Sequence, residues 1–366
     1  MDCSYHRAGT CRSCTLLHQP YSQQLRDKQA AAQAAVPHSS WEPPWAGPQS
    51  AFRNKAKMVA GGSTASPTLG ILDETLTGVD LVDCPLYEPA VATALPLLRD
   101  FVSLAALTPY SVSARRGELK HVIVTGSPAG RLMVRFVLRS TEAISRLRKH
   151  LPALQQRLPQ LSVASANIQP AHAAILEGDA EIALTENQIL TMTINGIDLR
   201  LRPGSFFQTN TTVAAALYRT AVDWTNDLAP ESVLDLYCGV GGFALHLAAP
   251  GRRVRGVEVS PAAVHAARAS AAASGKDAVF EIADATQATD LDVDLVVVNP
   301  PRRGLGGLAA RLQSSAARAV LYSSCNPATL ARDLAAMPGL QPERAQLFDM
   351  FAHNRHAELL TLLRRR

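Results

Sequence analysis

The second half of the chain alternates between short apolar runs and amphipathic segments. Runs such as VLDLYCG, RVRGVEVS, DLVVVNP and RAVLYSSC begin at residues 233, 253, 294 and 318. Continuous apolar strands separated by helices indicate a parallel sheet that is covered on both faces. Only AHNRH separates the last two runs, 344–351 and 357–363, and this segment is too short for a crossover helix. We therefore expect an α/β, Rossmann-like sheet in residues 201–366, with an antiparallel last strand.

Residues 51–200 follow a different pattern. Shorter strand-like runs, HVIVTG, RLMVRFVLRS, EIAL and LTMTING, are interspersed with helical segments such as 141–158. This pattern predicts a mixed α/β domain. The segment 37–48, PHSSWEPPWAGP, has the Pro, Ser and Gly content of a connector. We expect a small N-terminal segment with its linker at 1–50, ahead of the mixed domain.

The composition narrows the class of protein. Of the 366 residues, 47% are hydrophobic and 18% are charged, which is typical of a globular protein and not of a disordered one. The net charge of +5 favours a polyanionic partner such as nucleic acid. The N-terminus MDCSYHRAG has no apolar signal segment, and no run is long enough to span a membrane. We expect a cytoplasmic protein, in which the cysteines serve metal binding or catalysis and do not form disulfides.

A glycine-rich turn follows the first apolar run, in VLDLYCGVGGFAL at 233–245. Glycines such as Gly239 let a ligand approach the amides of a helix N-terminus. The next strand ends at Glu258, where a carboxylate accepts both ribose hydroxyls of a nucleoside, as in sites for NAD or S-adenosylmethionine. Asp284 is placed to accept from an adenine amino group. The alternative for Asp235 and Asp284 is simple loop capping.

The fourth strand ends in Asn299-Pro300-Pro301, where rigid backbone leaves acceptors facing a ligand cleft. An N-P-P turn in a nucleoside-binding sheet is similar to the catalytic motif of amino-group methyltransferases. Those enzymes usually place an aromatic residue next, to stack the target base. Arg302 stands there in this chain, which argues against that function.

Cys325 ends the fifth strand, and Asn326 and Pro327 are favourable residues at N-cap and N1 for a following helix. A helix N-terminus lowers the pKa of a thiol, and ligands bind at the C-terminal edge of a parallel sheet. This position favours a nucleophile. A buried structural cysteine is the alternative.

Four ordered motifs now carry a specific resemblance: DLYCGVGGF, NPPRRG, YSSCNPATLARDL and DMFAHNRHAELLTLL. Together with GSFFQTN at 204–210, they resemble the RNA uridine C5-methyltransferases that use S-adenosylmethionine. The resemblance covers essentially the whole chain. It implies that Cys325 adds to carbon 6 of uracil and that Glu358 removes the proton from carbon 5. An exposed strand end is the alternative for Glu358.

The resemblance also implies the cofactor site. The residues expected to line the S-adenosylmethionine site are Gln208, Tyr237, Glu258 and Asn299. Many relatives carry aspartate where this chain has Asn299, so the charge is lost and an acceptor is kept.

Cysteines crowd the N-terminus in the spacing C-x7-C-x2-C, formed by Cys3, Cys11 and Cys14, and Cys84 follows alone. Four thiolates suit either zinc or an iron–sulfur cluster, and the spacing leaves both open. Some members of the resembled family bind a [4Fe-4S] cluster through such cysteines, so the resemblance favours the cluster. Cys238 is expected to serve packing.

Two basic stripes suit contacts with RNA phosphates: Arg53, Lys55 and Lys57 recur at period two, and Arg131, Arg135 and Arg139, spaced by four residues, likewise share one face of a strand. The target base must be flipped out to meet a nucleophile in a cleft. By resemblance alone, the partner is 23S ribosomal RNA, methylated at a uridine of the position-747 type, with no membrane or obligate protein partner implied. The alternatives are a tRNA or other rRNA uridine, an amino-group methyltransferase, and a non-catalytic metal-cluster protein that binds RNA.

Overall fold

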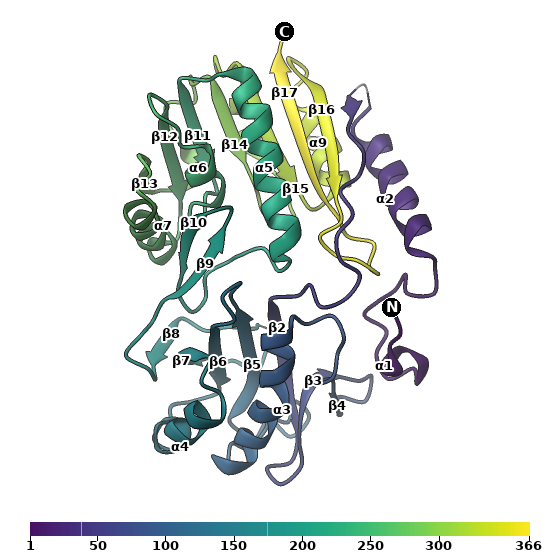
Figure 1. The fold of residues 1–366 in the computed structure, drawn as a ribbon, viewed down its shortest axis with the longest axis vertical. Coiled ribbons are helices and arrows are strands. Elements are labelled where there is room, and N and C mark those ends of the chain that lie inside the picture. Colours follow the sequence, from purple (N-terminus) through teal and green to yellow (C-terminus); the bar gives the residue numbers. More distant parts are fainter. Residues whose placement is uncertain (38, 174) are drawn as a thin grey trace. The chain divides into compact units, whose positions relative to one another are not determined.

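The computed structural model describes residues 1–37, 39–173 and 175–366. The chain forms two compact units, each organised around its own β-sheet (Figure 1). The smaller unit, unit 1, comprises residues 1–13 and 49–191, and unit 2 comprises residues 14–48 and 192–366.

In the described part of unit 2, a sheet of eight strands has the order β1-β16-β17-β15-β14-β11-β12-β13. Its strands are β1 (Ser40–Trp41), β11 (Ser232–Leu236), β12 (Arg253–Glu258), β13 (Val279–Ile282), β14 (Leu295–Val298), β15 (Ala319–Ser324), β16 (Leu340–Phe348) and β17 (Glu358–Arg365). Strands β11 to β15 are parallel to their neighbours in this set, whereas β17 is antiparallel to both β15 and β16. The predicted Rossmann-like sheet with an antiparallel last strand is therefore confirmed.

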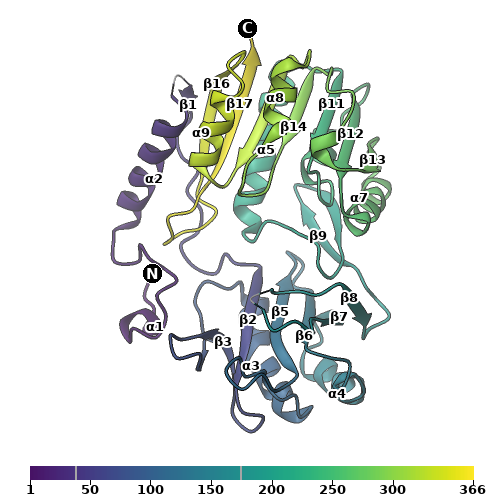
Figure 2. The same ribbon diagram turned by 180° about the vertical axis from the view of Figure 1, so that it is seen from behind.

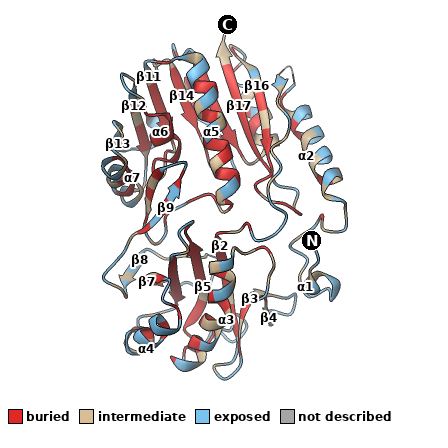
Figure 3. Cartoon of the chain, viewed as in Figure 1, coloured by how far each residue is buried: buried red, intermediate tan, exposed pale blue. Residues whose placement is uncertain are grey.

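Helices cover both faces of this sheet. They are α2 (Tyr21–Ala35), α5 (Thr211–Leu228), α6 (Gly242–Leu247), α7 (Pro261–Ser274), α8 (Gly307–Ser314) and α9 (Pro327–Ala335), with a short 3-10 turn η1 (Ala285–Gln287). Figure 1 shows α5 and α6 in front of the sheet, and Figure 2 shows α8 and α9 on the opposite face. The central parallel strands β11, β14 and β15 are buried along nearly their whole length (Figure 3), which explains their continuous apolar sequences.

The starts of two of these helices follow from their capping residues. Ser260 Oγ accepts a hydrogen bond from the backbone N–H of Ala263, and Pro261 occupies the first helical position of α7. In α9, the side chain of Asn326 accepts from the N–H of Ala328 at 3.1 Å. This cap fixes the point at which the chain turns out of β15, directly after Cys325.

The expected N-terminal segment and linker, 1–50, divide between the two units. Helix α2 belongs to unit 2, and β1, within the expected connector, pairs in parallel with β16. The physical reason is burial: Lys28 and Ala32 of α2 are buried, and Lys28 forms an ion pair with Asp349. Of the residues before 49, only 1–13 group with unit 1.

Unit 1 contains a mixed sheet of seven strands among its described residues, in the order β4-β3-β2-β5-β6-β7-β8. Its elements are α1 (Ser4–Arg7), β2 (Lys55–Gly62), β3 (Pro67–Leu72), β4 (Gly78–Asp80), α3 (Pro89–Leu104), β5 (Leu119–Gly126), β6 (Leu132–Leu138), α4 (Ile144–Arg157), β7 (Leu161–Ile168) and β8 (Ala180–Ala183). A separate hairpin of β9 (Leu190–Ile194) and β10 (Ile197–Leu201) follows.

The core of unit 1 lies on one face of its sheet, against α3 and α4. Met58 of β2 and Phe136 of β6 are buried there with Leu95, Phe101 and Leu147 of the helices. Alternation along β2 sends Lys55 and Lys57 to the opposite, helix-free face. None of the described helices is both long enough and apolar enough to span a membrane.

Candidate active site

Cys325 lies between β15 and α9 and is partly exposed. Ser324 Oγ accepts from the N–H of Asn326 at 3.2 Å. The Ser324 hydroxyl and the Asn326 side-chain amide therefore fix the turn around the thiol. The thiol thus stands at the C-terminal edge of the parallel strands, as the sequence predicted for a nucleophile.

Glu358 begins β17 and is only 3% exposed. In the antiparallel register Ser324 pairs with Leu359, so the next position along each strand places Glu358 opposite Cys325. Ser323 Oγ donates a hydrogen bond to Glu358 Oε1 at 2.5 Å. Burial raises the pKa of Glu358 to about 7, although the Ser323 bond lowers it. The alternative of an exposed strand end is wrong, because β17 lies between β15 and β16.

The net shift of the Cys325 pKa is upward. Burial raises the pKa of Cys325, and the nearby Glu358 carboxylate raises it further. A hydrogen bond from Arg302 lowers the pKa, but the other two effects outweigh it. The Arg302 guanidinium therefore favours ionisation of the thiol, and the charge of Glu358 opposes it.

Arg302 was recognised in the sequence only as an argument against an amino-group methyltransferase, and Ser323 was not singled out. The structure brings both to the reacting groups: Arg302 contacts the Cys325 thiol, and Ser323 contacts Glu358. The role of Ser323 could be inferred only from the register of β15 and β17, because its partner, Glu358, is distant in sequence.

The loop that carries Arg302 is held against α9. Asp333 Oδ2 accepts from Tyr322 Oη at 2.8 Å and from the N–H of Leu305 at 2.7 Å. Gly304 has a φ of 82°, and a Cβ there would lie 2.4 Å from Asp333 Oδ2. This close approach therefore requires glycine at the end of the NPPRRG motif.

Three of the four residues expected at the cofactor site line one pocket. Gln208, Tyr237 and Asn299 surround it with the glycine turn, including Gly239. The fourth, Glu258, accepts a hydrogen bond from the N–H of Gly239 at 3.2 Å and another from Ser260 at 2.9 Å. The four thus gather at the carboxyl ends of β11, β12 and β14, where nucleosides bind in such sheets.

Asp235 and Asp284 both act as local caps. Asp235 Oδ2 accepts from the N–H of Ala244 in α6 at 2.9 Å, and Asp284 accepts from the N–H and hydroxyl of Thr286. Burial raises the pKa of Asp235 to about 7, whereas the Thr286 bonds lower that of Asp284. The capping alternative considered for both residues accounts for these contacts.

The N-terminal cysteines are all free thiols. Cys3, Cys11 and Cys84 belong to unit 1, where burial raises the pKa of Cys84 and the nearby Cys3 and Cys11 raise it further. Cys14 groups with unit 2. Among the described residues, no three His, Cys, Asp or Glu side chains converge closely enough to hold a metal ion. Cys238, expected to serve packing, is buried.

The two basic stripes differ in how far their charge is compensated. Arg135 Nε lies 2.9 Å from Glu181 Oε1, and Arg135 also pairs with Glu177. Arg139 bonds Glu118 at 2.8 Å. The second stripe is therefore largely neutralised, because carboxylates from neighbouring segments pair with it.

Comparison with known proteins agrees with this geometry. A model of the methyltransferase small domain matches residues 196–322. The tRNA (uracil-54, C5)-methyltransferase of Pyrococcus abyssi, solved in complex with S-adenosyl-L-homocysteine, has a TM-score of 0.81 and 25% identity, covering 96% of this chain and 84% of that one.

Curated relatives are more similar. Proteins of Serratia proteamaculans and Cronobacter sakazakii are each 50% identical over 99% of both chains, and one of Escherichia coli O127:H6 is 48% identical over the same share. All three are named 23S rRNA (uracil(747)-C(5))-methyltransferase RlmC. The membership predicted from the motifs is confirmed: the chain belongs to the RlmC family of 23S rRNA uracil C5-methyltransferases.

Proposed function

We propose that this protein methylates carbon 5 of a uridine in 23S ribosomal RNA, at the position-747 type of site, with S-adenosylmethionine as methyl donor. The observation that carries the proposal is that Cys325 and the buried carboxyl of Glu358 lie next to the paired residues Ser324 and Leu359, near enough for Glu358 to act on the thiol. The names of relatives at 48–50% identity support the choice of RNA.

The two residues divide the chemistry. The Cys325 thiolate adds to carbon 6 of uracil, and the resulting enolate makes carbon 5 a nucleophile. Bound S-adenosylmethionine would supply the methyl group at carbon 5. Glu358 then takes the carbon 5 proton, and the carbon–sulfur bond breaks to restore the ring and the thiolate. A pKa of about 7 suits Glu358 to this task, because the carboxyl is partly ionised at neutral pH.

The cofactor residues fit a nucleoside. We propose that Glu258 accepts from the ribose hydroxyls and that Gln208, Tyr237 and Asn299 surround the remainder of the cofactor. Their common pocket beside the Gly239 turn supports this assignment. A Cβ at residue 242 would lie 2.4 Å from Tyr218 Oη, so this position of the turn has room only for glycine.

The test of the reaction uses substrate RNA that contains 5-fluorouridine at the target. Fluorine at carbon 5 cannot leave as a proton does, so the enzyme should remain covalently bound to the RNA through Cys325. We expect a retarded species on a denaturing gel with wild-type protein and none with Cys325→Ala. Calorimetric titration with S-adenosylhomocysteine should show that the variant still binds the cofactor.

Three other results would contradict parts of the proposal, and nucleoside mass spectrometry detects those that concern the RNA product. A methylated adenine or guanine product that is indifferent to Cys325→Ser would point to an amino-group methyltransferase. Absence of S-adenosylmethionine binding would point to a non-catalytic RNA-binding protein. Recovery of 5-methyluridine in a tRNA and not in 23S ribosomal RNA would change the substrate but leave the proposed reaction unchanged.

We also propose that Cys3, Cys11, Cys14 and Cys84 hold a [4Fe-4S] cluster. Thiolates are the ligands such clusters require, and within unit 1 Cys3 and Cys11 act electrostatically on Cys84. Anaerobically purified protein should contain iron and sulfide in equal amounts, and Cys11→Ser should lose both. Cys238→Ser, which changes a buried cysteine outside the set, should retain them. Zinc in place of iron would refute the cluster.

A further inference from the structure

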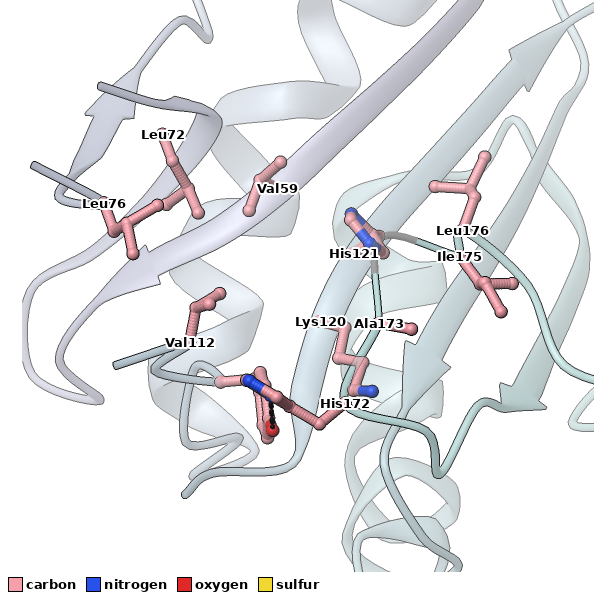
Figure 4. A pocket seen from close by; sticks show the side chains of 11 residues that line it. Val59, Leu72, Leu76, Val112, Lys120, His121, His172, Ala173, Ile175 and Leu176 are labelled. Carbon is pink, nitrogen blue, oxygen red and sulfur yellow. Dashed lines mark hydrogen bonds between the residues drawn. The ribbon is translucent and has the colours of Figure 1, made fainter. Parts of the chain in front are cut away.

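A pocket of about 570 Å³ opens on the helix-free side of the unit 1 sheet (Figure 4). Val59 of β2 and His121 of β5 form part of its wall, with Leu76 between β3 and β4, Val112 and Ile175. Its lining is mainly aliphatic: Val59, Leu72, Leu76, Val112, Ile175 and Leu176. Pockets of this size enclose ligands as large as a nucleotide.

Two of its aliphatic residues are unusually exposed. Leu76 is 49% exposed and Ile175 is 55% exposed, although both are large and apolar. Figure 4 shows side chains of the lining from separate segments arranged around one space. Apolar side chains that gather around a concavity are typical of a binding site, whereas scattered ones are not.

The polar groups of the pocket are the Lys120 ammonium and the rings of Tyr110, His121 and His172. Lys120 Nζ donates to Ala171 O at 2.7 Å and lies 4.7 Å from the centre of the Tyr110 ring. Burial lowers the pKa of His121 to about 4, and the charges of Lys120 and Lys57 lower it further. His121 is therefore neutral at neutral pH, with one ring nitrogen that donates and one that accepts.

Positive charge continues from the pocket along β2. Val59 pairs with His121 in the sheet register, and Lys57 lies two residues away on the same face. Lys57 forms no ion pair with any residue that the structure describes. Glu177 also lies near His121, but it is paired with Arg135. The pocket itself is lined by no Asp or Glu among the described residues.

We propose that this pocket binds an unstacked nucleotide of the substrate RNA, at a site separate from that of the target uridine. The aliphatic walls and the Tyr110 ring receive the base, the neutral His121 ring bonds its edge, and Lys57 and Lys120 attract its phosphates. The proposal rests on the proposed function, because RNA is the ligand. It assigns unit 1 a role in choosing the RNA, whereas unit 2 holds the reacting residues.

Two leucines of nearly equal exposure give a matched test. Leu76 lines the pocket, whereas Leu104, at the end of α3, is 48% exposed and does not. Leu76→Trp fills the pocket and Leu104→Trp adds the same ring elsewhere. With a 23S ribosomal RNA fragment that contains the target uridine, we expect Leu76→Trp to raise the KM for RNA about 10-fold, since stacking of one base contributes on this scale. Its kcat and S-adenosylhomocysteine affinity should be unchanged, and Leu104→Trp should match wild type throughout.

A second measurement locates the nucleotide. Fragments carrying a single 4-thiouridine outside the target position are irradiated with wild-type protein, and cross-linked peptides are identified by mass spectrometry. One position should cross-link to the pocket, and His121→Ala should weaken RNA binding in parallel. Equal KM values for the two tryptophan variants, or cross-links confined to other segments, would overturn the inference. If wild-type protein forms no 5-methyluridine in the fragment, the proposed function has failed instead.

Discussion

At the scale of single residues, two buried carboxyls with similar pKa values have different tasks. Burial raises the pKa of Asp235 and of Glu358 to about 7. Asp235 accepts from a backbone N–H of α6, which is fixed in place, whereas Glu358 accepts from a hydroxyl and stands opposite Cys325. Only Glu358 can therefore exchange its proton with a substrate beside the thiol, as a general base must.

Replacing Glu358 by Gln should separate the two halves of the reaction. The amide keeps the shape of the side chain and still accepts from Ser323, but it cannot take the carbon 5 proton. Addition of Cys325 and methyl transfer should proceed, and the covalent complex should persist with ordinary RNA. We expect turnover to fall roughly 10²- to 10⁴-fold, the usual contribution of a general base. A denaturing gel measures the complex, and near-normal turnover without a complex would exclude this role.

The hydroxyl of Ser323 should set the working pH. Its hydrogen bond favours the charged form of Glu358 and so lowers the pKa of that carboxyl. In Ser323→Ala the pKa of Glu358 rises, and the acidic limb of the kcat profile should move to higher pH because the base must be ionised.

Thr361 provides the control for the Ser323 experiment. It lies on β17, the strand that begins at Glu358, is fully buried, and its hydroxyl has no hydrogen-bond partner among the described residues. Thr361→Val should leave the pH profile unchanged. A Ser323→Ala profile that coincides with wild type would show that the hydroxyl does not tune Glu358.

At the scale of elements, α2 braces the loop that leads into β17. Lys28 Nζ donates to Asp349 Oδ1 at 2.6 Å and to Phe351 O at 3.0 Å, and Tyr21 Oη donates to Asp349 Oδ2 at 2.8 Å. Gln24 accepts from the N–H of His353 at 3.0 Å. Since Glu358 follows this loop directly, a helix near the N-terminus supports the position of a residue near the C-terminus.

Breaking the brace should destabilise unit 2. The side chains of Lys28 and Asp349 are 3% and 0% exposed, so Lys28→Met leaves a buried carboxylate without its cation. We expect the free energy of unfolding to fall by about 3–5 kcal/mol, as for other buried pairs that lose one partner. Chemical denaturation measures the loss.

Arg26 on the same helix is the matched control. It bonds only Gln23 in the contacts described, at an exposed position, so Arg26→Met should cost little. The double variant Lys28→Met with Asp349→Asn should recover part of the stability, because the uncompensated charge is removed. Equal stabilities of Lys28→Met and Arg26→Met would contradict a structural role for the pair.

At the scale of the whole molecule, the cofactor site and the proposed nucleotide pocket belong to different compact units, each with its own apolar core. All three tryptophans, Trp41, Trp45 and Trp224, belong to unit 2. Tryptophan fluorescence therefore reports the unfolding of unit 2 alone, whereas far-ultraviolet circular dichroism reports both units.

S-adenosylhomocysteine should stabilise only the unit that binds it. At about 100 times its Kd, a ligand adds about 2.7 kcal/mol to the stability of the folded state. The fluorescence transition should move to higher temperature, while a second transition seen only by circular dichroism should stay in place. Glu258→Gln should reduce the fluorescence shift. A single transition that moves as a whole with both probes would show that the two units unfold together.

Much of unit 2 could be predicted from local sequence. The apolar runs predicted the parallel strands, Asn326 and Pro327 predicted the start of α9, and the short AHNRH segment predicted an antiparallel last strand, because each signal involves residues close in the chain. The association of α2 with unit 2 could not be predicted, since the partner of Lys28 is Asp349. The neutralisation of the arginine stripe could not be predicted either, because the carboxylates that pair with Arg135 lie on another segment of the chain.

The sequence by itself determined the family, the order of the motifs and the identity of the candidate nucleophile, because these depend on residue types at fixed spacing. Tertiary structure decided the chemical state of those residues. Burial of Glu358 between two strands raises its pKa, Ser323 lowers it across the register, and the same carboxylate opposes ionisation of Cys325 while Arg302 favours it. A pKa depends on solvent exclusion and on charges brought near in space, so only the folded chain fixes it.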